Sequence, residues 1–543
     1  MPGSCRVHEA LPWVAAVTGG ILLFLGYAGF DQFYLDWICL VPVLWAIREQ
    51  RPGRAFLIGW VAGIAAHGGG FYWVIQMFQG FAGMAWPLAT LGFLLLAAAN
   101  GIVMAAWAWG TRLIIRDTGW NVAWVSPVVW TAAEKFWPEM FPNYLGASQY
   151  KLILLTQIAD VTGILGVSFF VVYINSTIYL FIEQWIKNRR FAWRQGAVFV
   201  VVVTIVLVYG GIRIQDIDRQ ASNAEKLTVG MIQANHGAGE KHRNPEAVLR
   251  DHLEMSETLA GSRSLDLIVW PEAIGNVSLT PRTGLLSSDL PGNLHTPMLF
   301  GKILSEWQED KRRFYNTAIL TDGRGQILGT YDKMVLVPFG EYIPFGDTFP
   351  WLYSWSPYSS RFWPGKSVEP LPLGKHSLSI SICYEDIFPG QIRSLMQVGR
   401  DGRIPDAMFN LTNDSWYGKS TEPMEHLALA SFRSIEHRRY LVRATNTGVS
   451  AFVDPVGRLV NCSGLWTKET LVDRISMMQG RTVYSLLGDW LGWGCAGLSL
   501  LGIGVVIRAA SRRKERDRQQ PDKGKKRQKK LRHKNWRQKP DFF

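Results

Sequence analysis

The first 213 residues contain a succession of apolar segments, and this pattern restricts the fold more than any other feature of the chain. A helix crosses a bilayer with about 20 apolar residues. Segments of roughly this kind lie at 11–29, 33–47, 55–76, 86–110, 120–138, 161–183, 196–212 and 484–509. The second is the weakest, because it contains Asp36 and Pro42. We therefore expect a seven-helix transmembrane domain over 1–213 and a final transmembrane helix at 484–509.

Basic residues are unevenly distributed among the connectors between these segments. The connectors after the second, fourth and sixth segments carry Arg48, Arg51, Arg54, Arg112, Arg116, Lys187, Arg189, Arg190 and Arg194. The connectors at 30–32 and 77–85 carry no Lys or Arg, and 139–160 has only Lys151. Because Lys and Arg accumulate on the cytoplasmic side, seven crossings that start inside deliver residue 213 to the outside. This alternation also supports the weak second segment.

The basic character of the chain is concentrated at its C-terminus. The formal net charge is +13, and residues 512–543 hold 15 Lys and Arg against 4 Asp and Glu. A basic tail can bind nucleic acid, but no nucleic-acid-binding signature accompanies this one, so we expect no nucleic-acid partner. A basic segment directly after an apolar helix instead indicates a cytoplasmic tail beside anionic membrane lipid. Its low-complexity composition predicts disorder.

Residues 226–480 have the pattern of a soluble α/β domain. Short apolar or alternating runs end in turn residues, at 227–233, 265–270, 317–320, 327–331, 377–383, 407–411 and 449–453. Helical patterns at 244–260 and 423–437 lie between them. Strands that alternate with helices predict a layered α/β domain, and the charge pattern places this domain outside the cytoplasm.

Cys383 is the cysteine whose position suggests chemistry. It ends the run Ser-Leu-Ser-Ile-Ser-Ile-Cys at 377–383 and is followed by the polar residues of Tyr384–Asp386. A cysteine between a strand and a turn is placed like a nucleophile, although a buried structural cysteine fits the strand equally well. Among the other cysteines Cys5, Cys39, Cys462 and Cys495, and among the ten histidines, there is no spacing typical of a metal site. We expect no metal and no cofactor.

Two further segments carry isolated charges at the ends of apolar runs. Glu272 ends Leu-Asp-Leu-Ile-Val-Trp-Pro-Glu at 265–272, at the carboxyl end of a predicted strand. A buried carboxylate there could serve as a general base, whereas a solvated loop acid is the plainer interpretation. Lys333 lies in a segment poor in charge, 331–344. A desolvated lysine can stabilise an oxyanion or a thiolate, and a surface lysine is the alternative.

Taken together, these segments resemble a known pattern. Trp-Pro-Glu272, Tyr-Asp-Lys333 and Cys383-Tyr-Glu385 follow the Glu, Lys, Cys order of the nitrilase superfamily. The fuller resemblance is to the apolipoprotein N-acyltransferase family, and it covers nearly the whole chain except the basic tail. It includes Leu-Val-Pro-Phe-Gly-Glu-Tyr-Ile-Pro (336–344), Ile-Cys-Tyr-Glu-Asp (382–386) and Leu-Thr-Asn-Asp-Ser-Trp (411–416). The chain departs from the family after its first predicted strand, where Lys241-His242 stands in place of Lys-Trp.

The resemblance implies a multi-span helical membrane domain joined to an αββα sandwich of the nitrilase type. It also implies roles for individual residues: Cys383 as nucleophile, Glu272 as proton acceptor and Lys333 as stabiliser of the oxyanion or thiolate. Glu341, Tyr384 and Glu385 would support them, Glu341 by orienting Lys333 or the base, and the other two by shaping the pocket floor. The implied reaction moves a fatty acyl group through a thioester from a phospholipid to the α-amino group of a diacylated apolipoprotein, at the outer face of a bacterial inner membrane.

Two other functions remain compatible with parts of the sequence. A membrane-tethered amidase or nitrilase could use the same three residues to hydrolyse a small amide or nitrile, but it would leave the preceding helices unexplained. A transporter or scaffold with an inactive enzyme domain would be indicated by charged residues inside the membrane. Those present, such as Asp36, Glu134 and Lys135, fall near the ends of the predicted helices.

Overall fold

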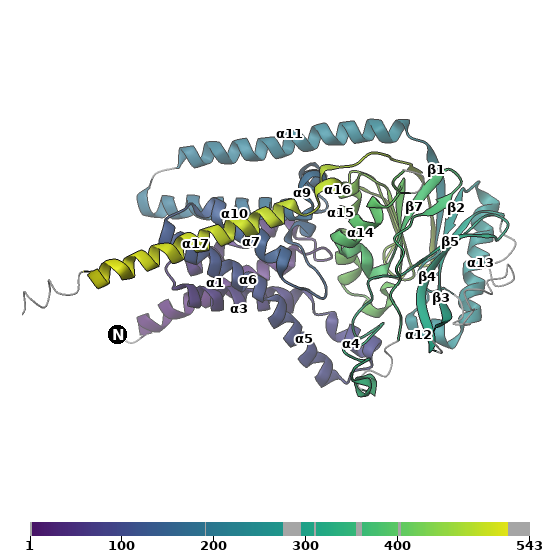
Figure 1. Cartoon of the computed structure of the whole chain (residues 1–543), viewed down its shortest axis with the longest axis horizontal. Coiled ribbons are helices and arrows are strands. Elements are labelled where there is room, and N and C mark those ends of the chain that lie inside the picture. Colours follow the sequence, from purple (N-terminus) through teal and green to yellow (C-terminus); the bar gives the residue numbers. More distant parts are fainter. Residues whose placement is uncertain are drawn as a thin grey trace, which may run out of the picture.

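The apolar segments form a bundle of helices at one end of the molecule, and the α/β region forms a sandwich at the other (Figure 1). The computed structural model describes residues 3–189, 192–274, 295–308, 311–354, 361–399 and 403–519. The N-terminal end of α1 and the C-terminal end of α17 both point away from the sandwich (Figure 1).

The predicted apolar segments are largely helical, but several of them are divided between two helices. The helices of the bundle are α1 (Gly3–Gly26), η1 (Phe33–Trp37), α2 (Val41–Ile47), α3 (Pro52–Gly70), α4 (Val74–Ala82), α5 (Trp86–Asn100), α6 (Ile102–Thr118), α7 (Val122–Phe136), η2 (Leu145–Gln149), α8 (Ile153–Thr156), α9 (Ala159–Thr162), α10 (Ile164–Asn188), α11 (Trp193–Asn223) and α17 (Trp490–Gln519). Among the described residues, five stretches are long and apolar enough to cross a membrane, and α3 with α4, bent by 56°, would make a sixth.

The predicted segment 33–47 differs most from the expected full span. It forms η1 and the seven-residue helix α2, and seven residues rise only about 10 Å, well short of a hydrocarbon core of about 30 Å. Pro42 lies at the start of α2, where proline is compatible with a helix. The helix α7 has 15 residues and is also shorter than the 120–138 prediction.

The C-terminal span also differs in its bounds. The predicted helix at 484–509 is divided into α16 (Val483–Leu487) and α17, with Gly488 between them at a φ of 63°. The helix α17 continues through the first basic residues of the predicted tail to Gln519. The prediction of disorder for the remainder of 512–543 concerns residues outside the described part of the chain.

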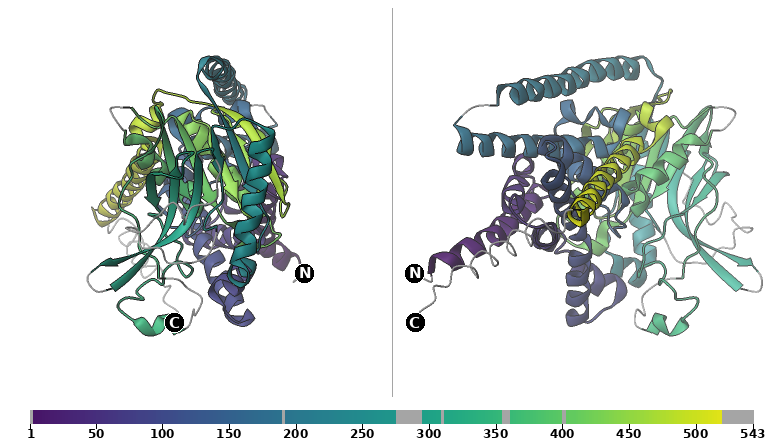
Figure 2. Two further views of the ribbon diagram at one scale, coloured as in Figure 1. Left: turned by 90° about the vertical axis from the view of Figure 1, so that its right-hand side faces the viewer. Right: turned by 60° about the vertical axis from the view of Figure 1, so that its left-hand side comes forward.

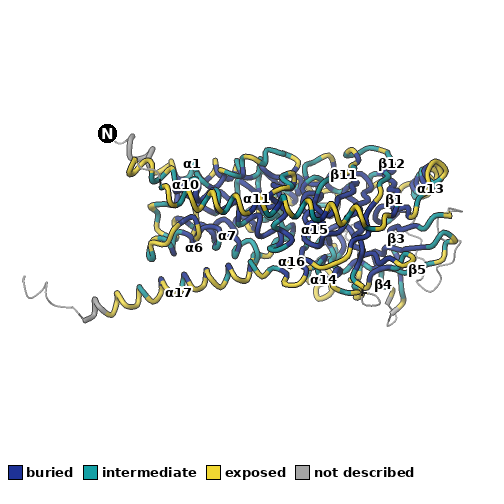
Figure 3. The backbone as a smooth tube through the Cα atoms, turned by 90° about the horizontal axis from the view of Figure 1, so that it is seen from above, coloured by how far each residue is buried: buried dark blue, intermediate teal, exposed yellow. Residues whose placement is uncertain are grey.

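The bundle packs through small residues where helices approach closely. A β-carbon on Gly59 of α3 would lie 2.5 Å from the carbonyl oxygen of Met104, and one on Gly63 would lie 2.5 Å from that of Gly101. Small residues that allow backbones to approach are the usual means of helix packing in membranes. By contrast, α11 and α17 expose most of their apolar side chains, so they lie at the edge of the bundle (Figure 3).

The basic connectors gather at the end of the bundle that faces away from the sandwich. Arg112 at the end of α6 donates a hydrogen bond of 2.7 Å to the carbonyl oxygen of Gln50, in the connector after α2. Asp117, one turn further on, interacts electrostatically with Arg513 of α17. The connectors that the charge pattern predicts to be cytoplasmic therefore share one end with the start of the basic tail.

The α/β region contains two six-stranded sheets within the described residues. Their orders are β12-β1-β2-β3-β4-β5 and β11-β10-β9-β8-β7-β6. The strands are β1 (Lys226–Gln233), β2 (Leu267–Val269), β3 (Met298–Gln308), β4 (Lys311–Thr321), β5 (Ile327–Asp332), β6 (Leu371–Leu373), β7 (His376–Ile382), β8 (Ala407–Thr412), β9 (Leu441–Thr445), β10 (Ala451–Val453), β11 (Leu459–Cys462) and β12 (Glu469–Ser476). The pairs β1–β2, β2–β3, β7–β8 and β8–β9 are parallel.

Helices cover both outer faces of the paired sheets, which gives the αββα sandwich that the family resemblance implies. The helix α13 (Pro245–Ser262) lies on the sheet that contains β1, and α14 (Pro389–Gln397) and α15 (Glu422–His437) lie on the other (Figures 1 and 2). The strands β7, β8 and β9 are buried on both faces, as expected for parallel strands between layers. The layer of α14 and α15 lies between the sheets and the helical bundle (Figure 1), so one apolar core continues through both parts.

Candidate active site

Three strand ends deliver the predicted catalytic side chains. The strand β2 leads through Trp270 and Pro271 to Glu272, β5 ends immediately before Lys333, and β7 ends immediately before Cys383. Carboxyl ends of strands are the usual location of ligand sites in α/β folds. All three side chains are buried, with exposed fractions of 7%, 1% and 6% respectively.

Lys333 lies between two carboxylates. Its Nζ atom is 2.9 Å from Oε1 of Glu341 and 3.7 Å from Oε1 of Glu272. The other oxygen of Glu341 accepts a hydrogen bond of 2.8 Å from the backbone N–H of Val337. Glu341 is therefore a direct partner of Lys333, and its role in orienting Lys333 stays a prediction.

Asn316 of β4 completes this cluster and was not identified from the sequence. Its Nδ2 atom donates to Oε1 of Glu272 at 2.6 Å and to Oε1 of Glu341 at 3.3 Å. An asparagine within a strand has no local sequence signature, because its role comes from the neighbouring strand ends. Asn316 thus fixes the distance between the two carboxylates.

Cys383 adopts a backbone conformation that holds its side chain at a sharp turn. Its φ of 51° is in the left-handed region, which is strained for a residue with a β-carbon. It begins the short helix η6 (Cys383–Ile387). The carbonyl oxygen of Cys383 accepts a hydrogen bond of 3.0 Å from Nδ2 of Asn410, which stabilises this conformation.

The electrostatics of the site couple the three groups. Burial raises the pKa of Glu272, while Lys333 and the hydrogen bond from Asn316 act in the opposite direction. Burial, and then the carboxylate of Glu272, raise the pKa of the Cys383 thiol, and Lys333 opposes them. Although burial disfavours a charged amine, Glu341 and Glu272 raise the pKa of Lys333. The site thus contains a permanent cation, a buried thiol and a carboxylate able to take its proton.

Glu385 is buried next to this cluster, and its part in shaping the pocket floor stays a prediction. Its oxygens accept hydrogen bonds from the hydroxyl of Tyr331 and from the backbone N–H groups of Met334, Val335 and Ile382, at 2.6–3.0 Å. Its side chain is fully buried. Glu385 therefore ties the segment that carries Lys333 to the strand end that carries Cys383.

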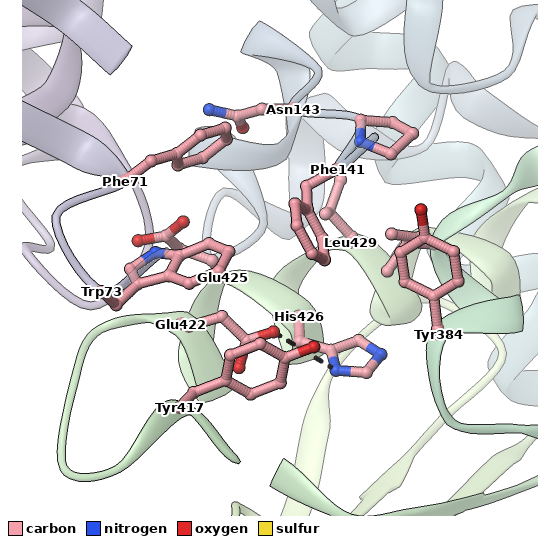
Figure 4. Close-up of a pocket in the computed structure, with 12 residues that line it drawn as sticks. Phe71, Trp73, Phe141, Asn143, Tyr384, Tyr417, Glu422, Glu425, His426 and Leu429 are labelled. Carbon is pink, nitrogen blue, oxygen red and sulfur yellow. Dashed lines mark ion pairs between the residues drawn. The ribbon is translucent and has the colours of Figure 1, made fainter. Parts of the chain in front are cut away.

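Tyr384 faces a cavity between the sandwich and the bundle, which we call the aromatic chamber (Figure 4). The chamber is lined by Phe71, Trp73, Phe141, Pro142, Asn143, Tyr384, Ile387, Tyr417, Glu422, Glu425, His426 and Leu429. The hydroxyl of Tyr384 donates a hydrogen bond to the carbonyl oxygen of Met140 in the bundle. Two residues of the chamber wall are neighbours of the thiol, because Tyr384 follows Cys383 directly and Tyr417 interacts electrostatically with it.

Aromatic rings from both parts of the molecule meet in the aromatic chamber. The ring of Trp73 is 5.3 Å from those of Phe141 and Tyr417, and the ring of Phe141 is 5.6 Å from that of Tyr384, all in edge-to-face geometry. Burial raises the pKa of Glu425 to about 8, so this acid is largely neutral at neutral pH. The walls of the chamber are therefore predominantly apolar.

Asp414, Glu422 and His426 lie close enough together to hold a metal ion, but their contacts describe an ion-pair network. The ring nitrogens of His426 lie 2.7 Å from Asp386 and 3.2 Å from Asp414, and Arg443 is 3.0 Å from Asp414. Although burial opposes it, Asp386 raises the pKa of His426 to about 10. A charged histidine and an arginine already balance these carboxylates, so the donor set fits a scaffold under the site.

Lys241 is a second residue near the site whose role the sequence did not indicate. It lies on the short helix α12 (Ala238–Arg243), and its Nζ atom donates a hydrogen bond of 3.0 Å to the backbone carbonyl oxygen of Glu272. The departure from the family at Lys241-His242 thus falls on a segment that touches the predicted base. The side chain of His242 lies outside the described residues.

Comparisons with known proteins agree with this architecture. Residues 19–177 match the apolipoprotein N-acyltransferase N-terminal domain, and residues 228–483 match the carbon-nitrogen hydrolase family. An apolipoprotein N-acyltransferase of Geobacter metallireducens is 29% identical, covering 93% of this chain and 97% of its own. That of Bradyrhizobium diazoefficiens is 30% identical, covering 88% and 91%.

A solved structure of Saccharomyces cerevisiae Nit3, a member of the nitrilase superfamily, is 17% identical and covers 48% of this chain and 93% of its own, with a TM-score of 0.35. The long matches to full-length relatives extend through both the helical bundle and the sandwich. The chain belongs to the apolipoprotein N-acyltransferase family.

Proposed function

We propose that this protein transfers a fatty acyl group from a phospholipid to the N-terminal α-amino group of S-diacylglyceryl cysteine in apolipoproteins, through a thioester on Cys383. The observation that carries the proposal is the position of the Glu272–Lys333–Cys383 cluster beside the aromatic chamber, where the sandwich meets the apolar helices. Family membership supports lipoprotein N-acylation. The geometry supports a reaction on lipid substrates.

In the first half of the reaction, Glu272 accepts the thiol proton and the sulfur of Cys383 forms a bond to the acyl carbonyl carbon. Lys333, with the backbone N–H of Tyr384, stabilises the tetrahedral oxyanion. The ester C–O bond then breaks, and the lysophospholipid oxygen takes the proton from Glu272. The products are a thioester and a lysophospholipid, and no redox step is needed.

In the second half, the α-amino nitrogen of the diacylated lipoprotein attacks the thioester carbonyl. Glu272 accepts a proton from the nitrogen, the C–S bond breaks, and the proton returns to the sulfur. The product is an amide, and the cycle is ping-pong. Because the acyl group moves from an ester to a thioester and then to an amide, the reaction requires no cofactor and no ATP.

A membrane location accounts for how both substrates reach the thiol. Each buried CH₂ contributes about 0.8 kcal/mol, so extracting acyl chains into water would be prohibitive. The aromatic chamber receives Phe71 and Trp73 from the junction of α3 and α4, which gives lipid chains an apolar path. We place the sandwich on the outer face of the bacterial inner membrane and the start of the basic tail in the cytoplasm, as the basic connectors indicate.

Mass spectrometry of the purified protein after mixing with phospholipid tests this proposal. We expect an acyl adduct on the peptide that contains Cys383, absent in Cys383→Ala, and its discharge to an amide when a diacylated lipopeptide is added. Transfer by Cys383→Ala should fall by at least about a thousandfold. Release of free fatty acid or of ammonia, without an amide product, would identify a hydrolase instead.

A further inference from the structure

Lys241 brings a second amino group to the site, in addition to that of Lys333. The reaction described above assigns no role to it. The hydrogen bond from its Nζ to the carbonyl oxygen of Glu272 is 3.0 Å long, and its charge interacts with both Glu272 and Cys383. Helix α12 follows β1 directly, so this contact links the first strand of the sandwich to the turn that carries the base.

The turn at Glu272 is strained and is held by contacts on both sides. Ala273 has a φ of 51°. The backbone N–H of Ile274 donates to the carbonyl oxygen of Gly301 at 2.9 Å, and the N–H of Gly301 donates to the carbonyl oxygen of Pro271 at 3.3 Å. These bonds attach the flanks of the turn to β3. Lys241 supplies a donor to the carbonyl between them.

We propose that Lys241 is a positioning residue of the active site: it fixes the turn that carries Glu272 and places a second positive charge beside the carboxylate and the thiol. The inference deepens the proposed function, because it rests on Cys383 being the nucleophile of that reaction. Lys241 forms no covalent bond in this scheme. Its charge favours the ionised forms of Glu272 and Cys383.

The effect of the Lys241 charge on the thiol is added to the effects of several other charged or titratable groups. Groups that interact electrostatically with Cys383 are Glu272, Lys333, Asp414, Lys241, Tyr384 and Tyr417. Burial lowers the pKa of Lys241 to about 8, against the effect of Glu272 and Cys383. The amine is therefore mainly charged near neutral pH, and it becomes mainly neutral as the pH rises above about 8.

Alkylation of Cys383 by iodoacetamide, measured in the full-length protein across pH, tests this inference without lipid substrates. Near neutral pH we expect Lys241→Met to slow alkylation about three- to tenfold, with the profile moved towards higher pH by up to about one unit. The difference should narrow at about pH 9, because the wild-type amine is then mostly neutral. Lys241→Arg should stay within about twofold of the wild type, since it keeps the charge.

Two controls come from the chain itself. Arg243 lies on the same helix with an exposed side chain, so Arg243→Met tests whether any change on α12 slows the thiol. Cys462 is an exposed thiol on β11 and provides an internal reference in each sample. In acyl transfer, Lys241→Met should lower kcat and leave KM within about twofold, because Lys241 does not line the aromatic chamber.

The inference is overturned if Lys241→Met alkylates at the wild-type rate and pH, or if Arg243→Met slows Cys383 equally. It is also overturned if Lys241→Arg is as slow as Lys241→Met, because the charge would then play no part. Failure of the proposed function would appear differently, as a wild-type Cys383 that alkylates normally and takes no acyl group from phospholipid.

Discussion

At the scale of single residues, the site shows how burial and charge are balanced around one thiol. Burial alone would keep Cys383 protonated and unreactive. Lys333 and Asn316 stabilise the ionised carboxylate of Glu272. That carboxylate is close to the thiol and can remove its proton. We therefore attribute the proposed reactivity of the sulfur to the cluster as a unit.

Asn316→Leu tests this balance at the residue that the sequence did not reveal. A donor to a carboxylate favours the ionised form, so removing Nδ2 should raise the pKa of Glu272 further. The acid limb of the rate profile should move to higher pH by about one unit, which is a loss of about tenfold on that limb. The loss should shrink as pH rises past the shifted limb. The measurement is acyl transfer against pH.

Asn461→Leu is the matched control, because Asn461 is a strand asparagine on β11 whose Nδ2 donates to the carbonyl oxygen of Val472 at 3.3 Å. It should retain the wild-type profile. A uniform loss across pH in Asn316→Leu, with no movement of the acid limb, would contradict the role assigned to this donor.

At the scale of elements, contacts between the bundle and the sandwich converge on Asp160 of α9. Its carboxylate accepts hydrogen bonds from Tyr209 at 2.6 Å and Arg213 at 2.9 Å, both on α11, and from Nη2 of Arg438 at 2.8 Å, directly after α15. Arg438 also donates to Oε1 of Gln157 at 2.6 Å. One buried carboxylate thus joins two membrane-domain helices to the helix layer of the sandwich.

Asp160→Asn should loosen this junction. It leaves Arg438, which is 4% exposed, without a charged partner, and breaking a buried ion pair from one side typically costs about 3–5 kcal/mol. We expect the apparent melting temperature in detergent to fall by at least about 5 °C, with faster proteolysis between α11 and β1.

Asp218→Asn provides the comparison for this junction, since Asp218 pairs with Arg458 at 2.8 Å on the surface. An exposed pair contributes at most about 1 kcal/mol, so this variant should melt close to the wild type. Equal shifts in the two variants would show that the Asp160 junction is no stronger than a surface pair.

The elements also show what the sequence could and could not predict. The α/β alternation and the apolar runs predict the two parts of the chain, because each pattern reflects which faces are buried. The bounds of single helices were less accurate. The apolar run of 33–47 forms two short helices, and Gly488 separates α16 from α17. Glu272, Lys333 and Cys383 were predictable from strand-end motifs. Asn316 and Lys241 act through tertiary contacts that leave no local pattern.

At the scale of the whole molecule, the direction of insertion decides which compartment the thiol faces. The exposed thiol of Cys462 reports on this directly, because β11 belongs to the sandwich. In a variant with Cys5, Cys39, Cys383 and Cys495 changed to alanine, a membrane-impermeant maleimide should label Cys462 in spheroplasts. Labelling should accelerate as pH rises, because the thiolate is the form that reacts.

A cysteine placed at Ser511 in the same background, with Cys462 also changed to alanine, completes the topology experiment. Ser511 lies near the end of α17, on the side with the basic connectors. It should react only after the membrane is permeabilised. Labelling of both positions from outside, or of neither, would contradict the proposed orientation.

Deleting residues 512–543 tests whether the basic tail takes part in the reaction. Two contacts that hold α17 to the bundle precede the deletion: Lys135 pairs with Asp489, and Gly502 packs against Ile114. The deletion removes most of the formal net charge of the chain but leaves Arg48 and Arg112 in the basic connectors predicted to be cytoplasmic, so insertion should be unchanged. We expect acyl transfer in membranes to stay within about twofold of the full-length protein. A deletion from residue 489 onwards, which removes the whole of α17 and the pair between Lys135 and Asp489, should lose activity because this packing is lost. Complete loss of transfer on removing 512–543 alone would assign the tail a part in the reaction and contradict a site formed only by the sandwich and the bundle.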